Sequence, residues 1–408
     1  MIPRPDLLTD RSPKGVEVFQ LTTETDVPSS HIYMEAQIFT PDSRRLVLHR
    51  SATPHGSDKD DPKHRYLVCD LANGCTLTPI TNELGATGPS ISPDGQWLYY
   101  FVNETKLGGG RLTLKRVHLD GTGRETLIVL DRPIPGTRYW PTQIYPLSTI
   151  SSDGERIAIS CFLGDGKTAG APWGLLVFDI ARAEVRLILE GPSWCNVHPQ
   201  YCRSRDRGAS HDILIQENHD NQCDALGNEI LLVGGAGADI HVIRDDGTRF
   251  RDMPWGRDGN EFCQGHQCWI GRSERAITST GTNDVDERQL IAGRAAPPAG
   301  HKGKLTPGGW RNDLSRRFPK PDFYHFATDI AGKRFITDSG PALGSNTYLA
   351  ELPDDQNAPL ENFVVLCCPR STWKGEAHTH PFLSPDGRVG FFNSDESGIL
   401  QAYMARGW

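Results

Sequence analysis

Seven times along the chain, a short polar turn leads into a run in which apolar and polar residues alternate. In its fullest form the turn is Ser-Pro-Asp-Gly, as in ISPDGQWLYYF from Ile91 and LSPDGRVGFFN from Leu383. Proline presets φ at the second turn position, and Asp and Gly accept the angles that follow. Val, Ile, Leu and aromatic residues at period two predict half-buried strands. The turns lie at Asp42, Asp94, Asp153, about Arg207, Ser273, Ala331 and Asp386.

The near-uniform spacing of the turns indicates a repeat protein. Each unit also carries a second hairpin, such as YLVCDLANGCTLTPIT from Tyr66. Four short strands repeated radially describe the blade of a β-propeller, and blades must stack to bury their faces. We therefore expect an all-β, seven-bladed β-propeller of four-stranded antiparallel blades, forming a single domain over residues 1–408. A tandem β-sandwich would need Greek-key crossovers, which this uniform period does not suggest.

The two ends of the chain predict how the ring closes. An early strand, VEVFQLT from Val16, has no blade of its own, and the last strand, ILQAYMA from Ile399, ends the seventh unit. We expect both in one sheet, because that pairing closes the ring and removes an exposed edge.

Composition and charge narrow the function classes. Hydrophobic residues make up 37 % of the chain, with 42 Gly and 29 Pro, which suits a turn-rich chain with a core. The net charge of -8 argues against nucleic acid as a partner. No apolar run is long enough for a transmembrane helix, so we expect no membrane partner. The N-terminus lacks an apolar signal segment, which favours a cytoplasmic location, or secretion if a leader was removed. A monomer and a small homo-oligomer are both compatible with the sequence.

The ten cysteines are scattered and contain no CxxC pair, which argues against a zinc ribbon. Cys69 and Cys75 flank a turn and could bridge a hairpin.

Histidines recur a few residues before the turns of four successive units. These are His198, His266, His325 and the pair His378 and His380. In a propeller this segment forms or precedes the innermost strand, so its side chains face the axis or its mouth. The alternative is that each is a buried histidine with its hydrogen bonds satisfied.

The His378-Thr-His380 spacing has a chemical consequence. Residues i and i+2 of a strand face the same side, so both imidazoles can reach one cation, with His325 as a third nitrogen ligand. Neutral imidazole suits Mn, Fe, Co, Ni or Zn better than Ca or Mg. A three-histidine site with open positions can bind a substrate carboxylate.

Two further side chains are candidates for substrate binding. Gln200 follows His198 on the same strand face and could contact sugar hydroxyls or hydrogen bond to an adjacent blade. Arg138, in GTRYW, precedes the third turn and could face the same mouth or form a surface salt bridge.

These histidine segments resemble those of the oligogalacturonate lyase family, seven-bladed propellers that degrade short pectin fragments. The similarity is strongest in AHTHPFLSPDGRVGFFNSDESGILQAYMA, and weaker similarity includes EGPSWCNVHPQY, CQGHQCW and HFATDIAGKRFITD. The resemblance implies that His325, His378 and His380 bind Mn²⁺ and that His266 is the catalytic base. It implies a polysaccharide lyase that cleaves an oligosaccharide beside a uronic acid by β-elimination and leaves a 4,5-unsaturated uronate.

Two departures from the family pattern put the substrate in doubt. Gly375 occupies the position of a metal-binding Gln, with Glu376 beside it. Asp239 stands where the family has a functional Arg, and Arg244 is out of phase with that position. Ca²⁺ or another divalent ion therefore stays an alternative to Mn²⁺.

Three other functions stay open at the level of sequence. One is a lyase that releases a sugar such as rhamnose from the terminal glucuronate of plant-gum side chains. Another is a non-catalytic binding propeller of the TolB or WD type. The third is a glycoside hydrolase, which usually needs a pair of carboxylates.

Overall fold

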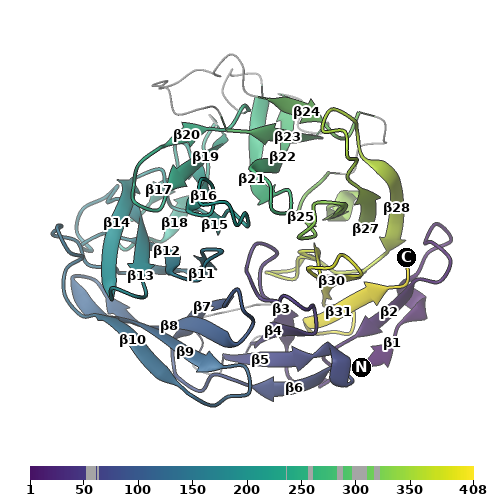
Figure 1. Cartoon of the computed structure of the whole chain (residues 1–408), viewed down its shortest axis with the longest axis horizontal. Helices are drawn as coiled ribbons and strands as arrows, with labels where there is room; N and C mark the ends of the chain where they lie inside the picture. The colour runs from purple at the N-terminus through teal and green to yellow at the C-terminus, as the bar shows by residue number, and fades with distance from the viewer. Residues whose placement is uncertain are drawn as a thin grey trace.

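Seven blades of antiparallel strands stand radially around a central axis in the computed structural model of the chain (Figure 1). Blades four and five are joined into one sheet by the pairing of Ala238 with Cys263. The structure describes residues 1–51, 61, 64–235, 237–255, 261–282, 288–295, 310–316 and 322–408. All seven predicted turns lead into the second strand of a blade, so the prediction of a seven-bladed β-propeller is confirmed. The innermost strands are β3 (Ser29–His31), β7 (Ala86–Ile91), β11 (Ile144–Ile150), β15 (Gln200–Tyr201), β21 (Glu261–Trp269), β25 (Phe326–Thr328) and β29 (Phe382–Leu383).

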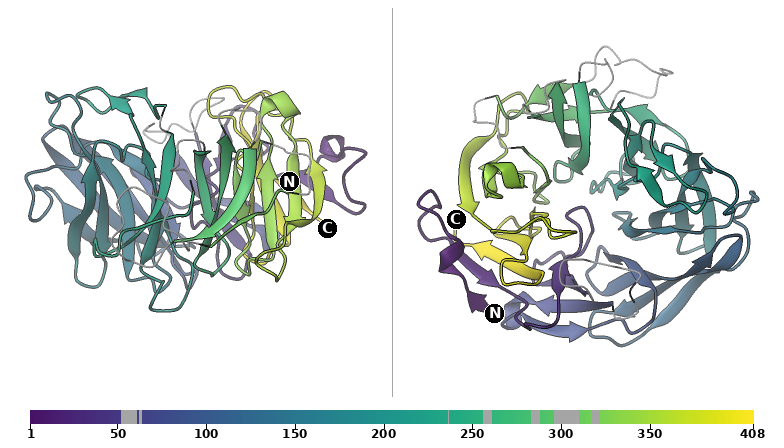
Figure 2. Two further views of the ribbon diagram at one scale, coloured as in Figure 1. Left: turned by 90° about the horizontal axis from the view of Figure 1, so that it is seen from above. Right: turned by 180° about the vertical axis from the view of Figure 1, so that it is seen from behind.

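The other strands of each blade follow outward in chain order, and Figure 2 shows the ring from the side and from behind. The second strands are β4 (Arg45–Arg50), β8 (Trp97–Lys106), β12 (Arg156–Phe162), β16 (Asp212–Asn218), β22 (Arg275–Thr282), β26 (Arg334–Asp338) and β30 (Val389–Ser394). The third strands are β5 (Arg65–Asp70), β9 (Gly109–His118), β13 (Trp173–Asp179), β19 (Ala238–Arg244), β23 (Arg288–Arg294), β27 (Thr347–Glu351) and β31 (Gln401–Arg406). The outer strands are β6 (Thr76–Pro79), β10 (Glu125–Leu130), β14 (Glu184–Gly191), β20 (Arg251–Asp252), β24 (Arg311–Asp313), β28 (Glu361–Cys367) and, in blade seven, β2 (Glu17–Gln20) followed by β1 (Ile2–Pro3).

The turn motif is built by its own side chains. In blade two, the Ser92 hydroxyl donates to Asp94, and the same carboxylate accepts the Gln96 amide at 3.0 Å. Ser92 Oγ also accepts the Trp97 amide at 2.9 Å, which starts β8. Gly95 has φ +74°, a left-handed conformation that glycine adopts without strain. The motif therefore fixes the hairpin locally and repeats wherever these residues recur.

Ring closure follows the prediction from the two chain ends. β2 pairs antiparallel with β31, with Glu17 opposite Arg406 and Gln20 opposite Tyr403. Val18, on β2, is 2 % exposed, so the closing strand also contributes to the core. The strand that precedes blade one in the chain is thus hydrogen-bonded into blade seven, which closes the ring and covers the edge of β31.

Three blades depart from the four-stranded pattern. Blade seven has five strands, and blade four carries an extra hairpin, β17 (Gln222–Cys223) and β18 (Glu229–Leu231). In blade one the inner strand is interrupted after β3 and resumes as a single bridge between Phe39 and Leu46. Residues 32–37, between these pairings, run toward the axis; we call them the blade-one loop. The 3₁₀ turns are η1 (Pro5–Leu7), η2 (Leu71–Asn73) and η3 (Pro341–Leu343).

All ten cysteines are free thiols, so Cys69 and Cys75 do not form the bridge considered from the sequence. Within the described ranges, no helix has the length and apolar character needed to cross a bilayer.

Candidate active site

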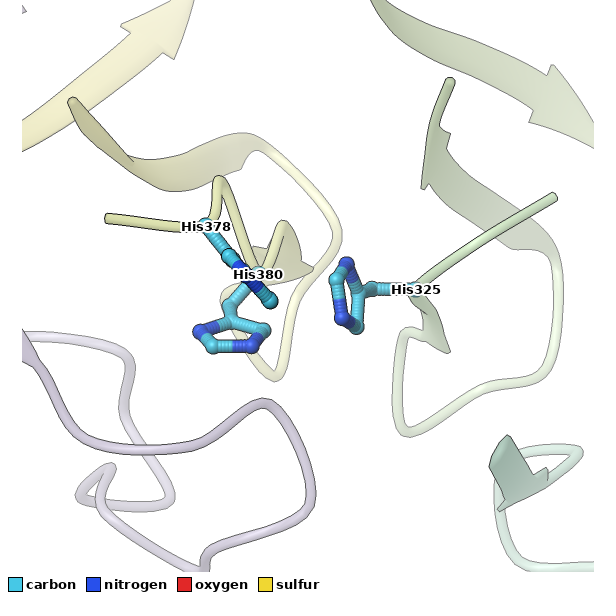
Figure 3. A group of neighbouring side chains, drawn as sticks. All are labelled: His325, His378 and His380. Carbon is cyan, nitrogen blue, oxygen red and sulfur yellow. The ribbon is translucent and has the colours of Figure 1, made fainter. Parts of the chain in front are cut away.

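Histidines from four consecutive blades meet at one end of the axis. The ring centroids of His198 and His266 are 6.0 Å apart, those of His266 and His325 are 4.7 Å apart, and those of His325 and His380 are 4.3 Å apart. One nitrogen from each of His325, His378 and His380 lies within 4.8 Å of the others. Figure 3 shows the three rings, two from the segment before β29 and one from the segment before β25, turned toward a common space.

Strand alternation does not bring His378 and His380 together, so that part of the prediction is wrong. Both residues precede β29 in irregular backbone, and His380 has φ +41°. His198, which precedes β15, also lies in the left-handed region, with φ +46°. Non-glycine residues adopt this region at a cost, and such strain is found preferentially at functional sites. The centroids of the His378 and His380 rings are still only 5.4 Å apart.

Asp338 orients His325. Its carboxylate accepts the Nδ1–H of His325 at 2.9 Å and the backbone N–H of the same residue at 2.7 Å. This contact leaves Nε2 of His325 as the free lone pair, the arrangement typical of a metal-binding histidine. Thr379 donates a further hydrogen bond to Asp338. Burial raises the pKa of the Asp338 carboxyl to about 7, although the hydrogen bonds from Thr379 and the His325 backbone act to lower it.

Two of the three clustered histidines have a lowered pKa, which favours the neutral ring that a cation requires. Burial lowers the pKa of His325 well below its usual value and also lowers the pKa of His378. Trp373 packs against both rings, with its ring centroid 5.8 Å from that of His325 and 4.6 Å from that of His378. The Trp373 indole N–H donates a hydrogen bond to the Ser345 hydroxyl at 2.7 Å. Neutral, oriented imidazoles are good ligands for a divalent cation.

A carboxylate also lies near the cluster. Glu376 lines the same cavity as His378 and His380, and its charge opposes the lowering of the His378 pKa. Gly375 has no side chain to offer, so Glu376 is the residue of this segment that can add an oxygen ligand. The three imidazoles fit a transition-metal cation such as Mn²⁺, whereas the Glu376 carboxylate is outside the group of mutually close ligand atoms.

His266 stands beside the cluster and is half-buried on β21. The strand pairing shifts register between Cys263 and Gln267, and Gly265 has φ +98°, so the backbone bulges at this histidine. Within the described part of the chain, Nδ1 of His266 has no hydrogen-bond partner. Burial lowers the pKa of His266 well below its usual value, and His325 and His198 act in the same direction. A neutral imidazole at this position can accept a proton.

The other predicted substrate-binding residues are placed differently. His198 is buried, and its ring lies between Glu35 and Tyr145, with Nδ1 2.9 Å from Glu35 Oε2 and Nε2 3.1 Å from the Tyr145 hydroxyl. The Gln200 amide donates to the Gln267 carbonyl of the next blade at 2.7 Å, the structural alternative considered from the sequence. Substrate contacts by these two residues stay predictions.

Arg138 is not brought to the histidines. Its side chain is exposed, and its guanidinium carbon lies 5.8 Å from the centre of the Tyr139 ring. Arg244 donates to the carbonyls of Gly208 and Arg207, also away from the cluster. Asp239 is paired with His219 at 2.7 Å.

A cavity of about 310 Å³ opens beside the metal-binding candidates. Three tyrosines, Tyr33, Tyr66 and Tyr145, line it together with Glu376, His378 and His380. Tyr33 lies between histidines, with its ring 4.7 Å from His380 and 5.2 Å from His198. The volume is enough for a sugar ring and its substituents.

Four residues of this region were not predicted. Tyr33 and Glu35 come from the blade-one loop, which carries none of the motifs that the sequence analysis uses. Tyr145 begins the third blade without any motif. Arg288, on β23, has its guanidinium 5.0 Å above the Tyr324 ring, and its charge is one cause of the low pKa of His266 and His325. A single sequence does not show that a basic residue at the start of a blade's third strand lies near the site.

Comparison with known proteins supports the fold. Neither protein-family models nor curated proteins match the sequence. Among solved structures, an oligogalacturonate lyase from Vibrio parahaemolyticus has a TM-score of 0.69 and 17 % identity, and an oligogalacturonate lyase in complex with manganese has 0.70 and 18 %. In both pairs the similarity covers 98 % of this chain and 96 % of the other. A prolyl endopeptidase has a TM-score of 0.52 at 9 % identity, over 94 % of this chain and 50 % of its own. At these identities the likeness shows a shared propeller fold.

Proposed function

We propose that this protein is a metal-assisted polysaccharide lyase that cleaves uronate-containing oligosaccharides by β-elimination. The observation that carries the proposal is the convergence of His325, His378 and His380 beside a fourth, neutral imidazole, His266, next to the cavity that His378 and His380 line. A binding scaffold has no need to gather so many histidines at one point. The solved oligogalacturonate lyases with the same fold, one of them a manganese complex, support this reading.

Each of these groups has a separate role in the proposed reaction. His325, His378 and His380 would hold a divalent cation, Mn²⁺ first among the candidates. When bound, such a cation supplies a Lewis acid for the uronate carboxylate and stabilises charge that develops at C5. His266 takes the C5 proton, which is acidic because it lies α to the carboxylate. The electron pair forms the C4–C5 double bond, the C4–O bond breaks, and no water is added.

We also propose Arg288 as the second cationic contact of the carboxylate. Its guanidinium lies on the Tyr324 face, and its Nη1 has no hydrogen-bond partner among the described residues. A guanidinium matches a carboxylate in two parallel hydrogen bonds. It would take the place of the arginine that the family resemblance locates near Asp239.

The groups in the site indicate a uronate as the class of substrate, and the following experiment identifies the sugar that is released. Purified protein is incubated with Mn²⁺ and either oligogalacturonides or a rhamnosyl-glucuronate disaccharide. The expected result is an ultraviolet band of an unsaturated uronate, with product masses that sum to the substrate mass. Products that are heavier by one water would indicate hydrolysis. No product from any uronate, with metal present, would overturn the lyase proposal. His266→Ala should abolish turnover and leave metal binding intact.

A further inference from the structure

A buried chain of hydrogen bonds joins the cavity wall to a carboxylate. Glu35 Oε2 lies 2.9 Å from Nδ1 of His198, and the Tyr145 hydroxyl lies 3.1 Å from Nε2 of the same ring. The three side chains come from the blade-one loop, from the segment before β15 and from β11. The side chains of Glu35 and His198 are only 3 % and 5 % exposed, whereas Tyr145 reaches the cavity that His378 and His380 line.

This geometry points to a proton-donating role for Tyr145, and we infer that its hydroxyl protonates the departing glycosidic oxygen. The inference rests on the proposed lyase function and names the group that the elimination still lacks. His266 removes a proton from C5, but the sugar that leaves C4 would depart as an unstable alkoxide unless an acid protonates it. His198 and Glu35 act through Tyr145, so they are positioning residues.

The charges of the relay decide which way Tyr145 points. Burial raises the pKa of the Glu35 carboxyl against the opposing effect of His198, so this buried pair holds a proton more readily than a free carboxyl does. When that proton lies on the imidazole, Nδ1–H donates to Glu35 and Nε2–H donates to the Tyr145 oxygen. The phenolic proton is then directed away from His198 and toward the cavity.

Protons balance over one turnover. The C4–O bond breaks while the Tyr145 hydroxyl gives its proton to the leaving oxygen. The Tyr145 oxygen takes the Nε2 proton of His198, whose ring becomes neutral beside the Glu35 carboxylate. His266 meanwhile holds the C5 proton and releases it to solvent, from which the relay is reprotonated. Neither water nor a covalent bond to the protein enters the products.

Vicinal elimination requires the acid and the base to lie close together. C5 and the C4 oxygen are neighbours in the sugar, so an acid and a base in contact with them stand on the order of 6–8 Å apart when each works at hydrogen-bond distance. The His198 ring, which Tyr145 contacts, has its centroid 6.0 Å from that of His266. Tyr33 packs beside both rings, with its ring centroid 6.5 Å from that of His266 and 5.2 Å from that of His198.

The test compares two leaving groups with the Mn²⁺-loaded protein. One substrate is the uronate oligosaccharide that the wild-type protein cleaves, and the other carries 4-nitrophenolate on C4, which leaves without protonation. Tyr145→Phe should lose about 10²- to 10⁴-fold in kcat on the oligosaccharide and stay within about threefold on the nitrophenyl substrate. Glu35→Gln should show the same dependence on leaving group with a smaller loss, whereas His266→Ala should lose both activities.

Tyr201→Phe is the matched control, because its buried hydroxyl also contacts a carboxylate, Asp245 at 3.0 Å, away from the cavity. Tyr201→Phe should change kcat on both substrates by the same small factor. Equal losses on both substrates for Tyr145→Phe, or full activity on the oligosaccharide, would overturn the acid role while the lyase function stands. Absence of elimination by the wild-type protein on either substrate would overturn both proposals.

Discussion

The contact between Asp338 and His325 gives a quantitative prediction for metal affinity. In Asp338→Asn one carboxylate oxygen becomes an NH₂ group, which cannot accept. In the wild-type protein, Oδ1 of Asp338 accepts the His325 backbone N–H, and Oδ2 accepts Nδ1–H of His325 and the Thr379 hydroxyl. If Oδ1 is replaced, one donor loses its acceptor, and if Oδ2 is replaced, two donors do. If Oδ2 is replaced, its NH₂ favours the His325 tautomer with the proton on Nε2, and the lone pair that faces His378 is lost.

The size of the effect follows from the kind of bond that is lost. A hydrogen bond to a charged group contributes about 1.5–3 kcal/mol. Since 1.4 kcal/mol is a factor of ten, we expect the Kd for Mn²⁺ to rise about 10- to 150-fold. The change is measured by isothermal titration calorimetry on protein stripped with chelator. kcat at saturating metal should fall less than the affinity does.

Asp245→Asn separates this effect from general destabilisation. Asp245 is a buried carboxylate that accepts from Nδ1 of His211 at 2.8 Å and lies outside the site. That variant should melt at a lower temperature and bind Mn²⁺ as the wild type does. A folded Asp338→Asn protein with unchanged Mn²⁺ affinity would refute the role given to Asp338 and weaken the metal-ligand assignment of His325.

The other predictions concern the anion contact, acid stability and ring closure. Arg288→Met should lower kcat/KM about 10- to 100-fold, as expected for loss of a charged hydrogen bond, with Arg288→Lys recovering part of it; unchanged kinetics would remove Arg288 from the site. His31 is 2 % exposed and burial lowers its pKa to about 3, so below the unfolded value of about 6.5 the unfolded state binds a proton that the native state does not. Stability should therefore fall by about 1.4 kcal/mol per pH unit as pH drops from 6.5 toward 3, roughly 2 kcal/mol by pH 5. Urea unfolding of His31→Leu should show a smaller pH slope, and an identical slope would contradict the buried neutral state. Deleting residues 1–20 uncovers the edge of β31, so the melting temperature should fall and the protein should self-associate; an unchanged monomer would show that closure by β2 is dispensable.

The fold was predictable because its signals are local. The turn before β8 is fixed by Ser92 and Asp94 within six residues, and the repeat of that chemistry counts the blades. Closure was predictable from the unpaired strand at Val16. The gathering of histidines followed from their common distance to the turns.

The site's supporting residues were not predictable, because they depend on contacts across the ring. Glu35 is 163 residues from His198, and the two meet only because the blade-one loop leaves its strand and runs to the axis. The segment before β29 was read as a regular strand, whereas His380 takes a left-handed conformation that its sequence does not signal. The position of Arg288 depends on how blade five is placed beside Tyr324.

The central claim is that three imidazoles at the mouth of the ring hold one cation, and anomalous diffraction tests it most directly. Crystals grown at neutral pH with Mn²⁺ are measured above and below the manganese absorption edge. We expect a single strong anomalous peak at bonding distance, about 2.0–2.3 Å, from one nitrogen each of His325, His378 and His380. A peak elsewhere, or no peak among these rings when the protein in solution binds Mn²⁺, would contradict it.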